Sequence, residues 1–492
     1  MIIQKVMCIK LVGENIRGKP MKEKSFARVL LFCLFVNVLY LCVSIVISRR
    51  AVGDDLEHIH AAWLVGQGLV PYLDFFEHHH PLMWFLFAPL ATAMSGNMLI
   101  FWVIRIICFL TSLATIYVIY RLIKDFWGDK ITALVAINVF LYSNIVMDSM
   151  VQFKPDTFMH FFFFLGLYLL FRFWRENKQK YLNLAALSWA VSFLFLQNLI
   201  FLLFPTAFFC ACLLAAKKMS WKSALKALPW VVVPLLMFLA YLLYTGSLQR
   251  YVETNWLLNS RIAGNIWTAR IKDFSCYYGL FSLGIGAAVF LLCSKPNKYL
   301  AVLLLMWLSE MILRTTYMSM WMYYYKIVVI YNAILISVVV GRFYARKNWV
   351  AWVAAPLMIG LLGKFWLFEG MKTNEIDTLS VMQVTTTIAQ NSTPDDVVIG
   401  LPGIPFGVFN KNPHYYWFSW GFIGRFDERY FHYAEPFDIN KVIAETKPKF
   451  VYYEEHKKRY PEVRKKYAID FRKLQETYRP AVYDTLFTLK DN

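Results

Sequence analysis

Eleven long apolar runs divide the first 368 residues of this chain. A helix rises about 1.5 Å per residue, so runs of this length suit the ~30 Å hydrocarbon core of a membrane. Hydrophobic residues make up 59% of the chain and charged residues only 17%, against about 25% charged in an ordinary soluble protein. The sequence therefore predicts an α-helical polytopic membrane protein with about eleven transmembrane spans. These are expected at 29–48, 97–120, 131–147, 157–173, 181–198, 199–216, 228–245, 276–293, 299–315, 327–342 and 349–368.

Basic residues are unevenly divided between the two sets of connections. The amino-terminal tail and the alternate connections carry 23 Lys and Arg, whereas the opposite connections carry nine. Cytoplasmic loops of membrane proteins are enriched in Lys and Arg. We therefore expect the amino terminus inside and the loop after the first span outside. The net charge of +19 is then explained by topology, and nucleic acid is not an expected partner.

The composition changes after Phe368. Pro and Gly turns appear there, with two short apolar runs, VVIG and KFVYYEE, and charged helical stretches. This pattern predicts a small α/β domain. We accordingly divide the chain into a basic cytoplasmic tail (1–28), a transmembrane domain (29–368) and an extracytoplasmic α/β domain (369–492).

The first outer loop holds two groups of titratable side chains near the membrane boundary. The first group is Asp54, Asp55, Glu57, His58 and His60, and the second is Asp74, Glu77, His78, His79 and His80. Such groups are costly there unless they are hydrated, paired or functional. A structural alternative is that Asp54 and Asp55 cap an amphipathic interfacial helix over 56–66. Because a cap needs only one acidic residue, we favour a functional site.

The order of residues in this loop resembles that of a known family. The aspartate pair is followed by GLVPYLDFFEHHHP, which supplies Gly68, Pro71, Tyr72, Asp74, Phe75, Phe76, Glu77, His78 and Pro81. The pattern is similar to that of bacterial integral-membrane GT-C glycosyltransferases, the branch related to protein O-mannosyltransferases and the lipid A aminoarabinose transferase. The resemblance implies a GT-C catalytic domain within the transmembrane region.

The resemblance also implies roles for the acidic residues. Asp54 matches the catalytic aspartate, which takes the proton of the acceptor hydroxyl as its oxygen attacks the anomeric carbon, and Asp55 would support it. The motif KPD at 154–156 matches a basic-Pro-Asp pattern before the fourth span and makes Asp156 a third catalytic candidate. Asp156 has the alternative role of a helix N-cap, and Asp148 is a second candidate for the acidic role.

Contacts to the donor phosphate are less well defined. Relatives often carry Lys at the end of the FFEH run, where this chain has histidines. The candidate phosphate ligands are Lys154, His78, His79, Arg261, Arg270 and Lys326. Supporting roles are assigned to Glu57, His58, Asp74, Glu77 and His80. Alternatively, Glu77 and His78 bind a divalent cation, because carboxylate and imidazole are common metal ligands. Both interpretations stay open at this point, together with a third, in which the histidines only contact lipid headgroups or solvent.

The resemblance implies an inverting glycosyltransferase that moves a sugar from a polyprenyl-phosphate donor to a hydroxyl of a lipid, glycan or protein. Such an enzyme works at the outer face of the cytoplasmic membrane, in glycosylation of the cell envelope. The sequence has no nucleotide-binding motif of the GxxxxGK[ST] type, which agrees with a donor attached to lipid. The alternative is a transporter or flippase of lipid-linked sugars, whose polar residues would lie near the bilayer midplane.

Overall fold

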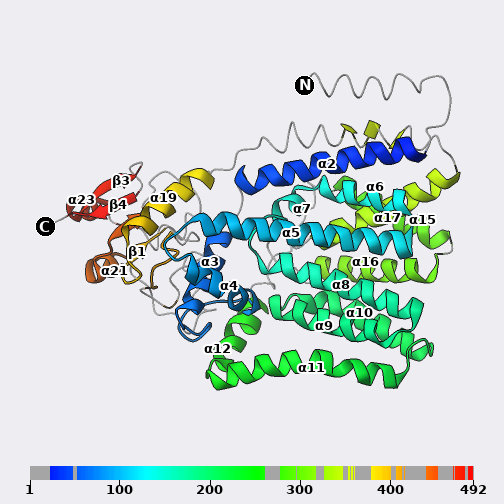
Figure 1. Ribbon diagram of the computed structural model, residues 1–492, viewed down its shortest axis with the longest axis horizontal. Coiled ribbons are helices and arrows are strands. Elements are labelled where there is room, and N and C mark those ends of the chain that lie inside the picture. Colours follow the sequence, from blue (N-terminus) through cyan, green and yellow to red (C-terminus); the bar gives the residue numbers. More distant parts are fainter. Residues whose placement is uncertain are drawn as a thin grey trace.

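The computed structural model shows a bundle of roughly parallel helices with a small sheet beyond one end (Figure 1). The carboxyl terminus lies at this end, beyond the sheet. The residues that the structure describes are 23–47, 52–260, 278–294, 296–316, 326–346, 353–354, 356–357, 359–360, 378–400, 406–412, 415, 439–452, 469, 471–482 and 486–490.

Ten of the predicted spans coincide with helices. These are α2 (Glu23–Ile47), α5 (Leu99–Leu122), α6 (Lys130–Leu141), α8 (Pro155–Glu176), α9 (Gln179–Phe195), α10 (Leu199–Ala215), α11 (Trp221–Tyr244), α15 (Tyr278–Cys293), α16 (Lys298–Thr316) and α17 (Lys326–Arg346). Among the described residues, five helices are long and apolar enough to cross a membrane: α2, α5 with its extension η1 (Ile123–Trp127), α8, α11 and α17. The chain is therefore a multi-span helical membrane protein. The number eleven stays a prediction, and the run 349–368 lies mostly outside the described residues.

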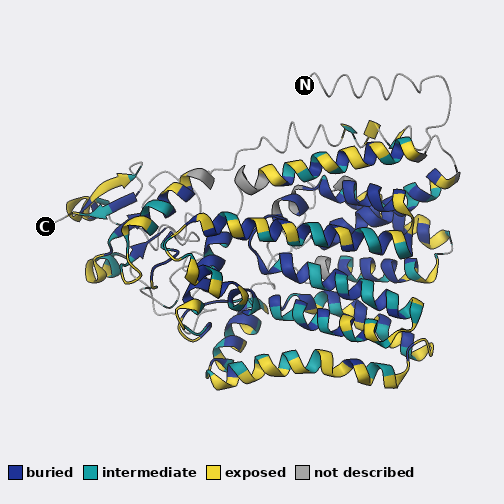
Figure 2. Ribbon diagram, viewed as in Figure 1, coloured by how far each residue is buried: buried dark blue, intermediate teal, exposed yellow. Residues whose placement is uncertain are grey.

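Packing orders the bundle around α8. This helix packs on α5 and α9, α9 packs on α11, and α17 packs on α6 and α15. Figure 2 shows that α11 is exposed along most of its length, whereas α8 carries buried residues along its length. The exposed side of α11 carries large apolar side chains such as Leu225, Leu236 and Leu243. A surface of this kind is suited to lipid and not to water.

The loop after the first span folds into two helices at one end of the bundle (Figure 1). α3 (Val52–Gly66) packs on α4 (Leu82–Ala93). Gly66 permits this approach, because a Cβ there would lie 2.0 Å from Thr92 Oγ1. The predicted interfacial helix over 56–66 thus exists, but its surroundings were predicted wrongly: Leu56, Ile59 and Trp63 are fully buried. α4 was not predicted, since its 12 residues are too few to cross the membrane.

The carboxyl-terminal region contains a four-stranded mixed sheet in the order β1-β2-β4-β3. β1 pairs parallel with β2, and the other two pairings are antiparallel. The strands are β1 (Val398–Ile399), β2 (Phe450–Tyr452), β3 (Tyr478–Val482) and β4 (Leu486–Leu489), and the helices include α19 (Thr378–Asn391), α21 (Ile439–Thr446) and α23 (Phe471–Thr477). β1 and β2 fall in the two apolar runs that predicted strands, which confirms a small mixed α/β unit.

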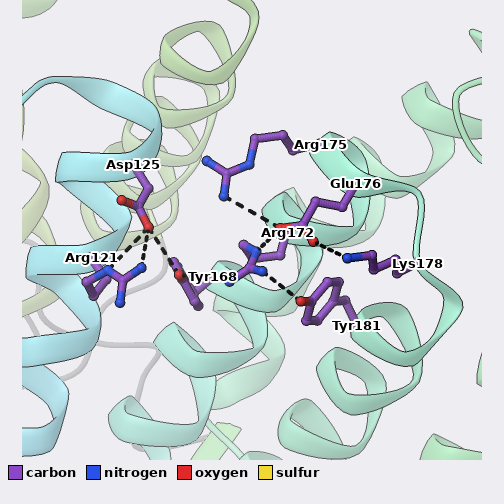
Figure 3. Close-up of polar contacts among 8 residues, drawn as sticks. All are labelled: Arg121, Asp125, Tyr168, Arg172, Arg175, Glu176, Lys178 and Tyr181. Carbon is purple, nitrogen blue, oxygen red and sulfur yellow. Dashed lines mark hydrogen bonds and ion pairs between the residues drawn. The ribbon is translucent and has the colours of Figure 1, made fainter.

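The connections 121–130 and 172–180 meet at the end of the bundle opposite α3 (Figures 1 and 3). Arg121 Nη2 and the Tyr168 hydroxyl both donate to Asp125 Oδ2, at 3.0 and 3.1 Å. In the second connection Arg172 and Lys178 both pair with Glu176. Arg175 and Tyr181 complete the group drawn in Figure 3. Surface pairs of this kind contribute at most about 1 kcal/mol each to the stability of the fold. Their cationic side chains lie together at one end of the bundle.

Candidate active site

Asp54 and Lys154 form an ion pair at the end of the bundle that holds α3. Asp54 lies in the first turn of α3, and Lys154 directly precedes Pro155, the first residue of α8. Lys154 Nζ lies 2.5 Å from Asp54 Oδ2, and the side chains are 11% and 46% exposed, respectively. Burial opposes the charge on Lys154, but the carboxylates of Asp54, Asp156 and Asp55 raise its pKa above the ordinary value. The site therefore presents an accessible carboxylate beside a charged ammonium.

Asp55 faces the interior and is held by a buried ion pair. Its Oδ2 accepts hydrogen bonds from Arg105 Nη2 at 2.5 Å and Nε at 3.0 Å, and its Oδ1 accepts the Phe153 N–H at 2.5 Å. Burial raises the pKa of Asp55, and Arg105 opposes this shift. Asp55 thus ties α3 to α5 and to the segment that carries Lys154. Its partners are not the N–H groups of its own helix, so the capping interpretation does not describe Asp55.

Arg105 was missed in the sequence analysis. It lies within the apolar run 97–120 and is fully buried. A lone arginine inside a membrane span is itself a signal, because such a charge needs a partner. The sequence gives no direct indication of which carboxylate that partner is.

The three consecutive histidines of the loop have different surroundings. Glu77 Oε2 accepts a hydrogen bond from the backbone N–H of His78 at 3.1 Å. The same oxygen lies 3.2 Å from His79 Nδ1. His80 turns away: its Nδ1 lies 2.6 Å from the Phe193 carbonyl, and its Nε2 lies 2.8 Å from the Tyr251 hydroxyl. Two histidines therefore stand beside Glu77, whereas the third anchors the loop to the bundle.

Glu57 completes a compact polar cluster. One ligand atom from each of Glu57, Glu77, His78 and His79 lies within 4.8 Å of the others. Burial raises the pKa of Glu57 well above its ordinary value, and the charges of Glu77 and Asp54 add to this shift. Burial also raises the pKa of Glu77 and lowers that of His78. Glu57 lies three residues after Asp54 on α3, so the cluster adjoins the candidate base.

His58 lies next to this cluster. Trp84 Nε1 donates to His58 Nδ1 at 3.3 Å, and the rings of His58 and His79 are 5.1 Å apart. Burial, followed by the charge of His79, lowers the pKa of His58 well below its ordinary value. His58 therefore lies directly beside the cluster, and its supporting role stays a prediction.

Hydrogen bonds from two distant segments and from Tyr72 of the same loop hold the backbone of the histidine loop. Gln197 Nε2 and Asn259 Nδ2 both donate to the His78 carbonyl, at 2.8 and 3.0 Å. The Tyr72 hydroxyl donates to the His79 carbonyl at 2.6 Å. Tyr72 itself has φ +70°, a left-handed conformation that costs on the order of 1–3 kcal/mol in a residue other than glycine. Strain at a bulky residue is maintained only where its surroundings enforce it, as they do here.

The carboxyl-terminal region contacts the loop after the first span at His60 and at Tyr72. His60 Nδ1 lies 2.8 Å from the Val408 carbonyl, and its Nε2 lies 2.7 Å from Asn412 Oδ1. The Tyr415 hydroxyl donates to the Tyr72 carbonyl at 2.7 Å. These contacts join residues separated by more than 340 positions. No local sequence pattern indicates such a contact, and the sequence analysis did not predict it.

We expect the contact at His60 to weaken in acid. Burial lowers the pKa of His60 in the folded protein. In the unfolded chain His60 has its ordinary pKa of about 6.5, so below that pH the unfolded state binds a proton that the folded state does not. Its contribution is therefore complete above that pH and falls as the pH decreases towards the folded pKa. Protection of residues 406–412 against hydrogen exchange, normalised for intrinsic rates, should decline below pH 6.5. In a His60→Phe protein, protection should be lower and insensitive to pH over this range; an unchanged profile would contradict the assignment.

The remaining predicted residues are distributed as follows. Lys326 is the first residue of α17 and is buried. It lies close enough to Asp156 and Lys154 for its charge to interact with theirs. Asp156 lies in the first turn of α8, after the capping position, which Lys154 occupies. Asp74 is exposed and accepts the Val70 N–H at 2.6 Å, so it closes a turn. Outside the described part of the chain are Arg261, Arg270 and the side chain of Asp148.

Comparison with known proteins bears on the matched part of this site. Residues 79–244 match the family model described as dolichyl-phosphate-mannose-protein mannosyltransferase. The match includes Lys154 and Asp156 but begins after Asp54, Asp55 and Glu57. It confirms the predicted resemblance and supports a membrane glycosyltransferase over a non-catalytic flippase.

A solved structure is also similar to this chain. It is described as ArnT from Cupriavidus metallidurans bound to undecaprenyl phosphate. The TM-score is 0.48 at 14% sequence identity, and the alignment covers 73% of this chain and 69% of that one. No curated protein matches the chain.

Proposed function

We propose that this membrane glycosyltransferase moves a sugar from a polyprenyl-phosphate donor to a hydroxyl group, with Asp54 as the general base. The observation that carries the proposal is the accessible Asp54 carboxylate beside the buried ammonium of Lys154. The matched family is named for a donor of this class, a sugar on a polyprenyl phosphate. A base for the acceptor and a cation for the phosphate are the two groups that such a transfer needs.

The reaction follows from this arrangement. The acceptor oxygen forms a bond to the anomeric carbon while the bond between that carbon and the phosphate oxygen breaks. The electron pair leaves with the polyprenyl phosphate, and the hydroxyl proton passes to Asp54. Attack from the side opposite the phosphate inverts the anomeric configuration. A positioned carboxylate contributes about 10²- to 10⁴-fold to a proton transfer of this kind.

The charge distribution supports an outward-facing site. Arg121 follows Arg105 on α5 by roughly 24 Å, so the basic connections lie far from the Asp55–Arg105 pair. With those connections in the cytoplasm, the site and the carboxyl-terminal sheet face the periplasm or exterior. The proposed acceptor is then a lipid, glycan or protein hydroxyl of the cell envelope. Glycolipid profiling of a deletion strain tests this, since loss of the protein should remove one sugar from one envelope component.

The role of Lys154 is tested by a pair of substitutions. We expect Lys154→Met to lower kcat/KM for the donor by roughly ten- to a hundred-fold, the loss expected for a hydrogen bond to a charged group. Lys154→Arg keeps the charge and should retain most of the activity. The measurement is sugar transfer in membranes at varied donor concentration. Equal activity of the Met and Arg proteins would show that the charge at this position does not contact the phosphate.

A further inference from the structure

We propose that Glu57, Glu77, His78 and His79 form a binding site for a divalent transition-metal cation beside Asp54. The cation would add a second positive charge to the site, in addition to Lys154, and would bind an oxygen of the donor phosphate. The binding site stands on geometry alone, whereas its role toward phosphate rests on the proposed function.

The donor set and its spacing suit a metal ion. Two carboxylates and two imidazoles form a mixed oxygen and nitrogen set that Zn²⁺ or Mn²⁺ accepts. Ligand atoms about 2.1 Å from an ion lie roughly 3–4 Å from one another in a tetrahedral site. The four atoms already lie within 4.8 Å of one another. Shifts of less than about 1 Å would therefore bring them to ligand positions.

One carboxylate oxygen of the cluster, Glu77 Oε1, is consistent with a bound cation. Glu77 is fully buried, and its Oε1 has no hydrogen-bond partner among the described residues. Its other oxygen is occupied by the His78 N–H and by His79. A buried carboxylate oxygen without a partner is rare in folded proteins, and a bound cation would satisfy it. Ligand oxygens of Glu57 and Glu77 lie within 4.8 Å of each other, and a dication would offset the repulsion between two carboxylates at this distance.

The placement of charges favours a metal over a direct phosphate contact through the histidines. Two carboxylates stand among the imidazoles, and ligand atoms of all four residues lie within 4.8 Å of one another. A phosphate bound directly to these imidazoles would lie beside like charges, whereas a dication would be attracted to both carboxylates. The arrangement therefore favours a cation ligand.

The loop is also held as a metal site requires. The His78 carbonyl is fixed by Gln197 and Asn259, and the His79 carbonyl by Tyr72. Partners outside the ligand set keep ligands oriented and support affinity. His80, with both ring nitrogens engaged elsewhere, is excluded from the set by the same packing.

The experiment measures metal binding without sugar transfer. The full-length protein in detergent micelles is stripped with a chelator, mixed with Zn²⁺ or, separately, Mn²⁺, and freed of excess ion. Bound metal is then counted by elemental analysis, and thermal unfolding is recorded. We expect one ion per chain and a rise in melting temperature. Glu77→Gln and His78→Ala should weaken binding by more than the roughly 10- to 100-fold that loss of an outer partner costs.

Two matched controls separate ligand loss from general damage. His60→Asn changes a buried histidine of the same helix as Glu57, and Asp74→Asn changes a carboxylate of the same loop. Both should bind one ion as the wild type does. If the wild type retains neither ion, or if Glu77→Gln binds as tightly as the controls, the proposal is wrong. The contact between His79 and Glu77 is then an ordinary ion pair.

The role toward phosphate is tested separately from the binding site. Asp54→Asn should bind the ion normally and fail in transfer, whereas chelation of the wild type should raise KM for the donor about tenfold. An active Asp54→Asn protein that binds the ion would reject the proposed base and leave the metal site in place. Normal metal binding with an unchanged KM after chelation would reject the phosphate contact alone.

Discussion

Replacement of Asp54 by asparagine should lower sugar transfer by about 10²- to 10⁴-fold, the contribution of a positioned general base. The substitution keeps the size of the side chain and removes its charge and its ability to accept a proton. The amide oxygen of asparagine can still accept a hydrogen bond from Lys154 Nζ, and Lys154 keeps the nearby charges of Asp156 and Asp55, so the protein should fold and insert normally. The measurement is transfer of labelled sugar from a polyprenyl-phosphate donor in membranes that contain equal amounts of protein.

The matched control for Asp54 is Asp395→Asn. Asp395 is 78% exposed in the carboxyl-terminal region and pairs with Lys411, which is itself 60% exposed. This variant should transfer sugar at the wild-type rate. Wild-type transfer by the Asp54→Asn protein would remove the assigned base. Loss of transfer in both variants would point to a general effect on the fold.

Replacement of Arg105 by methionine should lower the free energy of unfolding by about 3–5 kcal/mol, the usual cost of removing one partner from a buried ion pair. Arg105 and Asp55 are 0% and 1% exposed. Without the guanidinium, Asp55 keeps only the Phe153 N–H, and its charge is buried without compensation. The expected result is a large decrease in melting temperature, measured in detergent. Transfer activity should fall as well, because the same carboxylate positions the segment before Lys154.

Two further variants test whether burial causes this loss. Arg121→Met breaks a surface pair with Asp125, in which Arg121 is 35% exposed, and should cost at most about 1 kcal/mol. The double variant Asp55→Asn with Arg105→Met removes both buried charges and should regain part of the stability lost in Arg105→Met. Equal destabilisation by Arg105→Met and Arg121→Met would contradict the structural role of the buried pair.

Much of the fold was accessible from local patterns. Apolar runs placed ten helices to within seven residues at either end, and two short runs placed β1 and β2. The residue order GLVPYLDFFEHHHP indicated the loop that holds the candidate site. These features are readable because hydropathy and turn chemistry act over a few neighbouring residues. The burial of α3 and α4 was not readable, since it depends on helices that come later in the chain.

The assignment of individual site residues shows where local information ends. Three identical histidines follow one another, yet two stand beside Glu77 and His80 bonds to Phe193 and Tyr251, 113 and 171 positions away. The two adjacent aspartates also differ in their surroundings: Asp54 is open to solvent, whereas Asp55 is buried and paired with Arg105. Sequence order and composition were sufficient for a membrane-embedded helical chain, for its loops and for the identity of the acidic loop. Tertiary packing alone decided which carboxylate is accessible and which histidines converge, because those properties depend on desolvation and on partners supplied by distant segments.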